Sequence, residues 1–111
     1  MKKQVIKIMP DYECSPIWHS GYLVGNVDPD DLPITEELKT LLDDWQNKFD
    51  LTLNLDYPPD SGFKTVREEN EFKKQGLKIY EMMTRELGEN YEIHYFNVFS
   101  RRLYKSFEEL R

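Results

Sequence analysis

Few side chains in this sequence are of the types that catalyse reactions or bind metals. It contains one cysteine, Cys14, and two histidines, His19 and His94. Together with Asp11 they could form a small catalytic or ligand-binding site in which a histidine activates the thiol. Histidine and cysteine do not recur at the spacing of a metal site, and the acidic stretch 28–31 lacks the glycine and glutamate of a calcium-binding loop. We therefore expect neither a metal nor a cofactor.

Simpler roles are available for the same residues. His94 falls within a strand-like segment, where a hydrogen-bonded structural histidine is common. A lone cysteine is usually a small, partly buried apolar residue. A small enzyme or ligand-binding domain that uses Asp11, Cys14, His19 and His94 is therefore the alternative hypothesis, and it requires all four side chains to converge in one pocket.

Acidic residues dominate one continuous part of the chain. The 111 residues include 15 Lys and Arg against 21 Asp and Glu, a net charge of -6. Residues 10–62 alone hold twelve acids against Lys39 and Lys48, a balance of -10. A protein that neutralises nucleic-acid phosphates needs clustered Lys or Arg, so we expect no nucleic-acid partner. The acidity favours a basic protein partner, although many acidic surfaces serve solubility alone.

Aromatic residues are interleaved with these acids. Trp45 belongs to an amphipathic helical pattern, which predicts that its side chain is part of the core. Tyr12, Trp18 and Tyr57 lie in loop-like sequence, where an exposed aromatic side chain can anchor an interface. The other interpretation is that they form a loop core folded over the edge of a sheet.

Length and composition indicate one globular domain, residues 1–111. Fifteen aromatic residues exclude intrinsic disorder, and a single cysteine excludes an internal disulfide framework. The sequence has no apolar run long enough to span a bilayer, and Met1 is not followed by a signal peptide. We therefore expect a cytoplasmic protein with no membrane partner.

Strands are predicted near 3–9 and 91–98, where β-branched and aromatic residues concentrate. Residues 20–27, interrupted by Gly21 and Gly25, favour a short strand or hairpin arm. Alternating leucines over 51–55 indicate a brief extended segment, which the prolines at 58 and 59 end.

Two main helices are predicted near 35–49 and 65–87. Each has an apolar stripe at helical spacing, and Thr35 and Thr65 are in place to cap them. The last residues, 99–111, form a C-terminal extension that we expect to be helical. These elements predict an α/β (α+β) fold in which the strands near 3–9 and 91–98 share a sheet packed by the two helices.

A longer pattern extends over roughly residues 5–96. It consists of Ile8-Met9-Pro10-Asp11-Tyr12, Cys14, Pro16, Trp18, then Val24-Gly25-Asn26-Val27-Asp28-Pro29-Asp30-Asp31-Leu32-Pro33-Ile34, and further of Leu38, Leu42, Trp45, Phe49-Asp50, Thr52-Leu53-Asn54, Ser61-Gly62-Phe63, Phe72, Gly76, Glu86-Leu87-Gly88 and Tyr95-Phe96. This pattern resembles a family of small bacterial immunity proteins of toxin systems, including contact-dependent growth inhibition.

The resemblance implies a cytoplasmic protein that binds and neutralises one cognate toxin and has no catalytic residues of its own. Toxins of this kind are often basic nucleases, which would suit an acidic inhibitor. We expect the partner-binding surface to combine five carboxylates with three aromatic anchors: Asp28, Asp30, Asp31, Asp43 and Asp44 with Tyr12, Trp18 and Tyr57.

Overall fold

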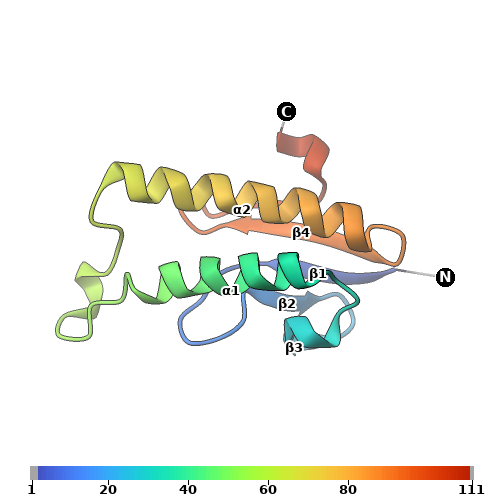
Figure 1. Cartoon of the computed structure of the whole chain (residues 1–111), viewed down its shortest axis with the longest axis horizontal. Coiled ribbons are helices and arrows are strands. Elements are labelled where there is room, and N and C mark those ends of the chain that lie inside the picture. The colour runs from blue at the N-terminus through green and yellow to red at the C-terminus, as the bar shows by residue number, and fades with distance from the viewer. Residues whose placement is uncertain (1–2, 111) are drawn as a thin grey trace.

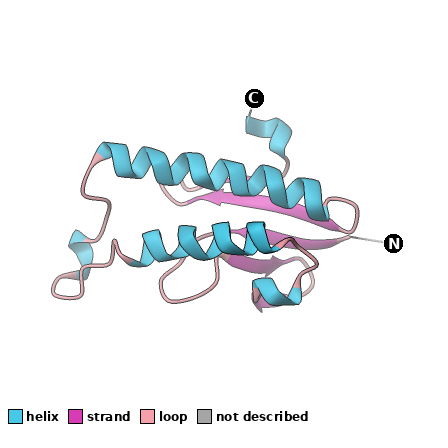
Figure 2. Ribbon diagram, in the orientation of Figure 1, coloured by secondary structure: helices cyan, strands magenta, loops and turns pink. Residues whose placement is uncertain are grey.

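A mixed five-stranded sheet with two long helices on one of its faces forms the fold (Figure 1, Figure 2). The structure, a computed structural model, describes residues 3–110, so residues 1, 2 and 111 of the predicted domain lie outside the described residues. The strands are β1 (Gln4–Ile8), β2 (Ile17–Ser20), β3 (Val24–Asn26), β4 (Tyr91–Asn97) and β5 (Arg102–Tyr104). Their order is β3-β2-β1-β4-β5; β1 and β4 are parallel, and the other neighbours are antiparallel. The predicted α+β class is confirmed.

Both predicted helices are present, each beginning one residue after its threonine cap. Helix α1 is Glu36–Asp50, and the Thr35 side chain accepts a hydrogen bond from the backbone N–H of Leu38. Helix α2 is Val66–Leu87, and Thr65 accepts in the same way from Glu68. These bonds satisfy backbone donors that have no partner within the helix. Neither helix, within the described part of the chain, is long and apolar enough to cross a membrane.

The register of β1 decides which side chains face the helices. Ile6 lies opposite His19 on β2 and Ile93 on β4, and the next residue, Lys7, lies opposite Trp18 and His94. Successive residues of a strand point to opposite faces. Ile6 and Ile93 are buried beneath the helices, so Trp18 and His94 lie on the face of the sheet that the helices leave uncovered.

Aromatic side chains fill the space between the helices and the sheet. Trp45 is fully buried, stacks on Phe72 and donates its indole N–H to the Phe72 carbonyl at 2.9 Å, as its predicted core position requires. Tyr80 on α2 stacks on Tyr95 of β4. At Gly76 of α2, an added Cβ would lie 2.8 Å from both the Trp45 ring and the Tyr95 hydroxyl. The glycine therefore permits this close approach.

The expected extended segment at 51–55 is instead a turn and an irregular loop. Thr52 donates its hydroxyl to the carbonyl of Phe49, and the Asn54 side chain accepts from the backbone of Asp56 and Tyr57. Such local side-chain bonds compete with strand pairing. Leu51 and Leu55 are 84% and 81% exposed, so the alternating leucines do not mark a buried face.

The C-terminal residues also differ from the expected helix. The Asn97 side chain accepts from the backbone of Phe99 and Ser100, and this turn returns the chain as β5 alongside β4. A short 3-10 helix, η3 (Phe107–Leu110), follows and packs Phe107 against the Tyr80 ring. The prediction for 99–111 is therefore corrected to a strand followed by one short 3-10 helix.

Candidate functional site

A hollow of about 550 Å³ lies between the 11–16 loop, the 3-10 helix η1 (Pro29–Asp31) and α1. Four carboxylates line it, those of Glu13, Asp28, Asp43 and Asp50, and Lys39 is the one cation among its lining residues. We call it the acidic hollow. All of its walls come from the acidic segment 10–62.

Helix α1 provides one long wall through a polar stripe at helical spacing. Lys39, Asp43, Gln46, Asn47 and Asp50 follow one another at steps of four, three, one and three residues, which places them on one face of the helix. The adjoining face of α1 carries the buried apolar residues that hold it against the sheet and α2, and Leu42 lies at the border between the two faces. Packing of the core therefore turns this stripe toward the hollow.

The 11–16 loop forms the second wall and is tied to the end of α1. Asp50 Oδ1 accepts the backbone N–H of Glu13 at 2.8 Å, and Gln46 Nε2 donates to the Asp11 carbonyl at 2.6 Å. Glu13 has a positive φ of 60°, which the bond to Asp50 helps to hold. Tyr12 stacks on Phe49 at 4.6 Å between ring centroids. The loop therefore has a defined position against the helix.

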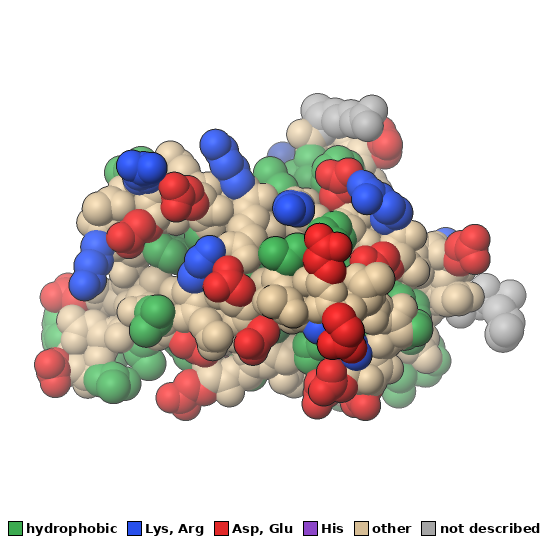
Figure 3. All heavy atoms as spheres, viewed as in Figure 1, with side chains coloured by type: hydrophobic (Ala, Val, Ile, Leu, Met, Phe, Trp, Pro, Cys, Tyr) green, Lys and Arg blue, Asp and Glu red, His purple; other side chains and the backbone are tan. Residues whose placement is uncertain are grey.

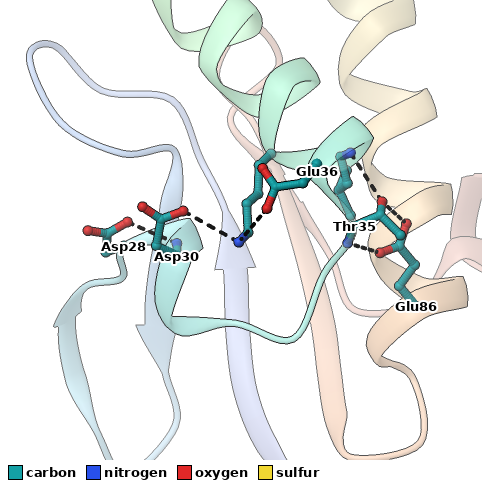
Figure 4. A network of polar contacts seen from close by, with 7 residues as sticks. Asp28, Asp30, Thr35, Glu36 and Glu86 are labelled. Atoms are coloured by element: carbon teal, nitrogen blue, oxygen red, sulfur yellow. Dashed lines mark hydrogen bonds and ion pairs between the residues drawn. The ribbon is translucent and has the colours of Figure 1, made fainter.

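The third wall, η1, begins at Asp28, whose side chain accepts the backbone N–H of Asp30. Lys39 Nζ lies 3.5 Å from Asp30 Oδ1 and 3.3 Å from Glu36 Oε1 (Figure 4). The hydrogen bond that Lys39 donates to the Glu36 carboxylate is the main cause that raises the pKa of Lys39. Because Lys39 forms ion pairs with these two acids, its positive charge only partly balances the negative charge of the other carboxylates of the hollow.

One buried polar atom in the wall of the hollow lacks a partner. Gln46 is 7% exposed, and its Nε2 donates to the Asp11 carbonyl and to Asp50 Oδ1. Its Oε1 accepts no hydrogen bond from any residue of the range 3–110. A buried acceptor without a donor costs about 1–3 kcal/mol.

Basic side chains lie mainly on the other half of the molecule. Figure 3 shows Lys and Arg chiefly over α2 and the loop before it, whereas Asp and Glu lie over both helices and below α1. Most bases of α2 have an acidic neighbour one turn away, as in Arg67–Glu71, Lys73–Glu69 and Arg85–Glu81. The charge imbalance along the sequence is therefore also an imbalance across the molecule.

The predicted partner-binding carboxylates are only partly brought together. Asp28 and Asp43 line the acidic hollow, and Asp30 and Asp31 lie beside it in η1. Asp44 lies on another side of α1, where it accepts from Gln75 at 3.0 Å and pairs with Lys48 at 3.1 Å. The bond from Gln75, followed by that from Lys48, lowers the pKa of Asp44.

The three predicted aromatic anchors lie in three different places. Tyr12 packs on Phe49 as part of a loop core. Trp18 is half-buried on the uncovered face of the sheet and donates its indole N–H to the Met9 carbonyl at 2.9 Å. Tyr57 is 58% exposed, at the tip of the loop between the helices.

The comparisons with known proteins bear on what such a molecule does. A family model described as "Serratia CdiI immunity protein-like" matches residues 4–98. The chain belongs to this family. The resemblance found in the sequence is confirmed over almost the same residues, and a search of the curated proteins found no match. Membership of an immunity-protein family suggests a role without catalysis.

The four residues of the enzyme hypothesis do not converge. His19 and His94 lie opposite adjacent residues of β1 and therefore on opposite faces of the sheet. Burial and the nearby charges of Asp11 and Asp50 raise the pKa of the Cys14 thiol, which disfavours the reactive thiolate. His94 Nε2 is paired with Glu92 on its own strand. Within residues 3–110 no three His, Cys, Asp or Glu residues are grouped to hold a metal.

The sequence reasoning missed most residues that line the immunity protein's acidic hollow, among them Glu13, Gln46 and Asp50. For Gln46 and Asp50 a signal was present, because they follow Asp43 at three and seven residues, on the same face of a helix that the sequence predicts. Glu13 had no such signal, because its place depends on a turn with positive φ and on a bond to a residue 37 positions away.

Proposed function

We propose that this immunity protein binds and neutralises a cognate toxin in the cytoplasm. The toxin domain that it binds is a nuclease with a basic contact surface. The observation that supports this proposal is the acidic hollow, where four carboxylates face one lysine that other acids already hold. Asp31 and Asp43 have no ion-pair partner among residues 3–110, so both can pair with a partner's cations.

A basic nuclease suits such a surface for a simple reason. An enzyme that cleaves nucleic acid holds phosphates with Lys and Arg, and the same side chains form charge-assisted hydrogen bonds with carboxylates. A protein that presents carboxylates can therefore cover the nucleic-acid-binding surface. Complementary charge also accelerates the encounter between the two proteins.

We infer that neutralisation needs no turnover by the immunity protein. The separation of His19 from His94 across the sheet supports this inference, because it removes the one catalytic constellation that the sequence offers. Binding alone can suffice, since pairs of toxin and inhibitor can reach very high affinity.

The test is co-expression with the toxin domain encoded next to this chain's gene. We expect the chain to restore growth of cells that make the toxin, and the purified proteins to form a complex at micromolar concentration or below. Absence of both rescue and complex would overturn the proposal.

The role of charge can be tested by reversing it on each half of the molecule. We expect the double variant Asp31→Lys, Asp43→Lys to lower the association rate with the toxin about tenfold at low salt, because steering depends on unpaired surface charge. The difference should shrink near 0.5 M salt, where screening is strong. Stopped-flow fluorescence measures both rates.

The matched control is Glu68→Lys with Glu89→Lys, which changes the net charge equally on the α2 half and also replaces acids that have no ion-pair partner among residues 3–110. Both glutamates are exposed and lie away from the acidic hollow. We expect this variant to slow association by less than about threefold. Equal slowing by the two double variants would contradict a binding surface on the α1 half.

A further inference from the structure

We propose that the acidic hollow receives an arginine side chain of the toxin, whose guanidinium is held by Asp43, Asp50, Glu13 and Gln46. This inference rests on the proposed function and goes further, because it assigns a chemical group and a position to the central contact. Three observations carry it: the charge balance of the hollow, its free acceptors and their fixed geometry.

The charge balance calls for a cation from outside the chain. Asp28 holds the first turn of η1 through the N–H of Asp30, and Lys39 is engaged by Asp30 and Glu36. Asp43 and the Glu13 side chain have no ion-pair partner among residues 3–110. Carboxylates that share one hollow repel one another, and an entering cation relieves that repulsion.

The free acceptors outnumber the donors of a single ammonium group. Asp50 uses Oδ1 for both Glu13 N–H and Gln46 Nε2, which leaves its second oxygen. Gln46 Oε1 is the buried acceptor without a partner in the described chain. A guanidinium carries five N–H donors in a planar fork, whereas an ammonium carries three from one point. The acceptors therefore match arginine better than lysine.

The hollow also suits a side chain better than a bare metal ion. Its acceptors are distributed around about 550 Å³, and no three acidic, histidine or cysteine residues in the range 3–110 are close enough to coordinate one ion. A long, planar cation can contact separated acceptors at once.

The acceptors are already in place before a partner arrives. The 11–16 loop is bonded to α1 at both Asp50 and Gln46, and the Tyr12 ring packs on Phe49. Acceptors fixed in advance lose little conformational freedom on binding. The hollow should therefore act on the lifetime of the complex in addition to the rate of encounter, to which the outer acids contribute as well.

The test compares two double variants with equal charge change. Asp43→Asn with Asp50→Asn alters the hollow, and an asparagine at 50 can still accept from Glu13 and Gln46. Glu37→Gln with Glu89→Gln is the control outside it. Binding to the catalytically inactive toxin domain is measured by surface plasmon resonance. We expect the hollow variant to raise the dissociation rate about 30-fold or more, and the control to change it less than about threefold.

Two further measurements locate the arginine and guard against misfolding. Each toxin arginine is replaced by alanine, and for one of them the effects with Asp43→Asn should be non-additive by about tenfold or more. Glu13→Gln, in the loop and outside α1, should raise the dissociation rate without changing the unfolding midpoint.

The outcomes separate this inference from the proposed function. If the wild-type chain binds and protects but both double variants dissociate equally fast, or no toxin arginine couples to Asp43, the arginine site is wrong and the immunity function stands. If the wild-type chain does not bind the toxin, the proposed function fails and the arginine site fails with it.

Discussion

Gly76 is a residue at which the packing of this immunity protein leaves no room for a side chain. A Cβ there would lie 2.8 Å from the Trp45 ring, and that ring is fixed by its bond to the Phe72 carbonyl. We expect Gly76→Ala to lower the free energy of unfolding by about 1–2 kcal/mol. Both neighbouring side chains are buried, so the overpacking cost should lie in the upper part of its range of about 1–3 kcal/mol and exceed alanine's advantage of about 1 kcal/mol in a helix.

Urea denaturation of Gly76→Ala measures the change, and Lys78→Ala, exposed on the same helix, is the control. We expect the control to differ from wild type by less than about 0.5 kcal/mol. A Gly76→Ala variant as stable as wild type would show that the Trp45 and Tyr95 side chains can give way.

At this scale the sequence predicted buried residues better than exposed ones. The position of Trp45 followed from helical spacing, and it is buried. Tyr12, Trp18 and Tyr57 shared a loop-like context yet have three different environments, because the partners that cover them, such as Phe49 for Tyr12, come from distant parts of the chain.

At the scale of elements, the start of α1 is joined to the end of α2. Thr35 donates its backbone N–H and its hydroxyl to the two carboxylate oxygens of Glu86 at 2.7 and 2.9 Å, while its hydroxyl oxygen caps Leu38 (Figure 4). We expect Thr35→Ala to cost about 1–2 kcal/mol of stability, and Thr35→Ser, which keeps the hydroxyl, much less.

A double-mutant cycle tests the link itself. Glu86→Ala should cost less in the Thr35→Ala background than in wild type, because one of its two bonds is already absent. Thermal unfolding of the four proteins gives the coupling. Strictly additive effects would show that Glu86 and Thr35 contribute independently.

Elements with strong internal signals were predictable, and elements defined by their neighbours were not. The helices α1 and α2 carry caps and apolar stripes of their own. The short strand β5 has no such pattern: its three residues are a strand because the Asn97 turn places them beside β4. The leucines at 51–55 show the reverse, a strand-like pattern that has no neighbouring strand.

At the scale of the whole molecule, the interface between the helices and the sheet depends on two neutral phenols. Burial raises the pKa of Tyr95 to about 12, and burial with the nearby Glu109 and Glu92 raises that of Tyr80 to about 12. Both groups ionise near pH 10 in the unfolded chain. Their stabilising contribution is therefore complete below pH 10 and is lost as the pH rises toward 12.

We expect Tyr95→Phe to have a shallower fall in stability between pH 10 and 12 than wild type, since the variant has no phenol to ionise at that position. Denaturant unfolding at a series of pH values measures the slope. Tyr57→Phe, whose ring is exposed, should keep the wild-type slope. A Tyr95→Phe slope equal to wild type would contradict a buried, neutral Tyr95.

Because β1 pairs in parallel with β4, the sheet cannot be completed during synthesis until β4 has been made. Residues 4–8 leave the ribosome well before residues 91–95, with which they pair in the middle of the sheet. Closing so long a loop is entropically costly, and the Ile6 and Ile8 side chains have no complete cover until α2 and β4 have emerged. The resistance of a cell to the toxin then depends on how many full-length chains it holds. An mRNA truncated before the codons for β4 would give no protection.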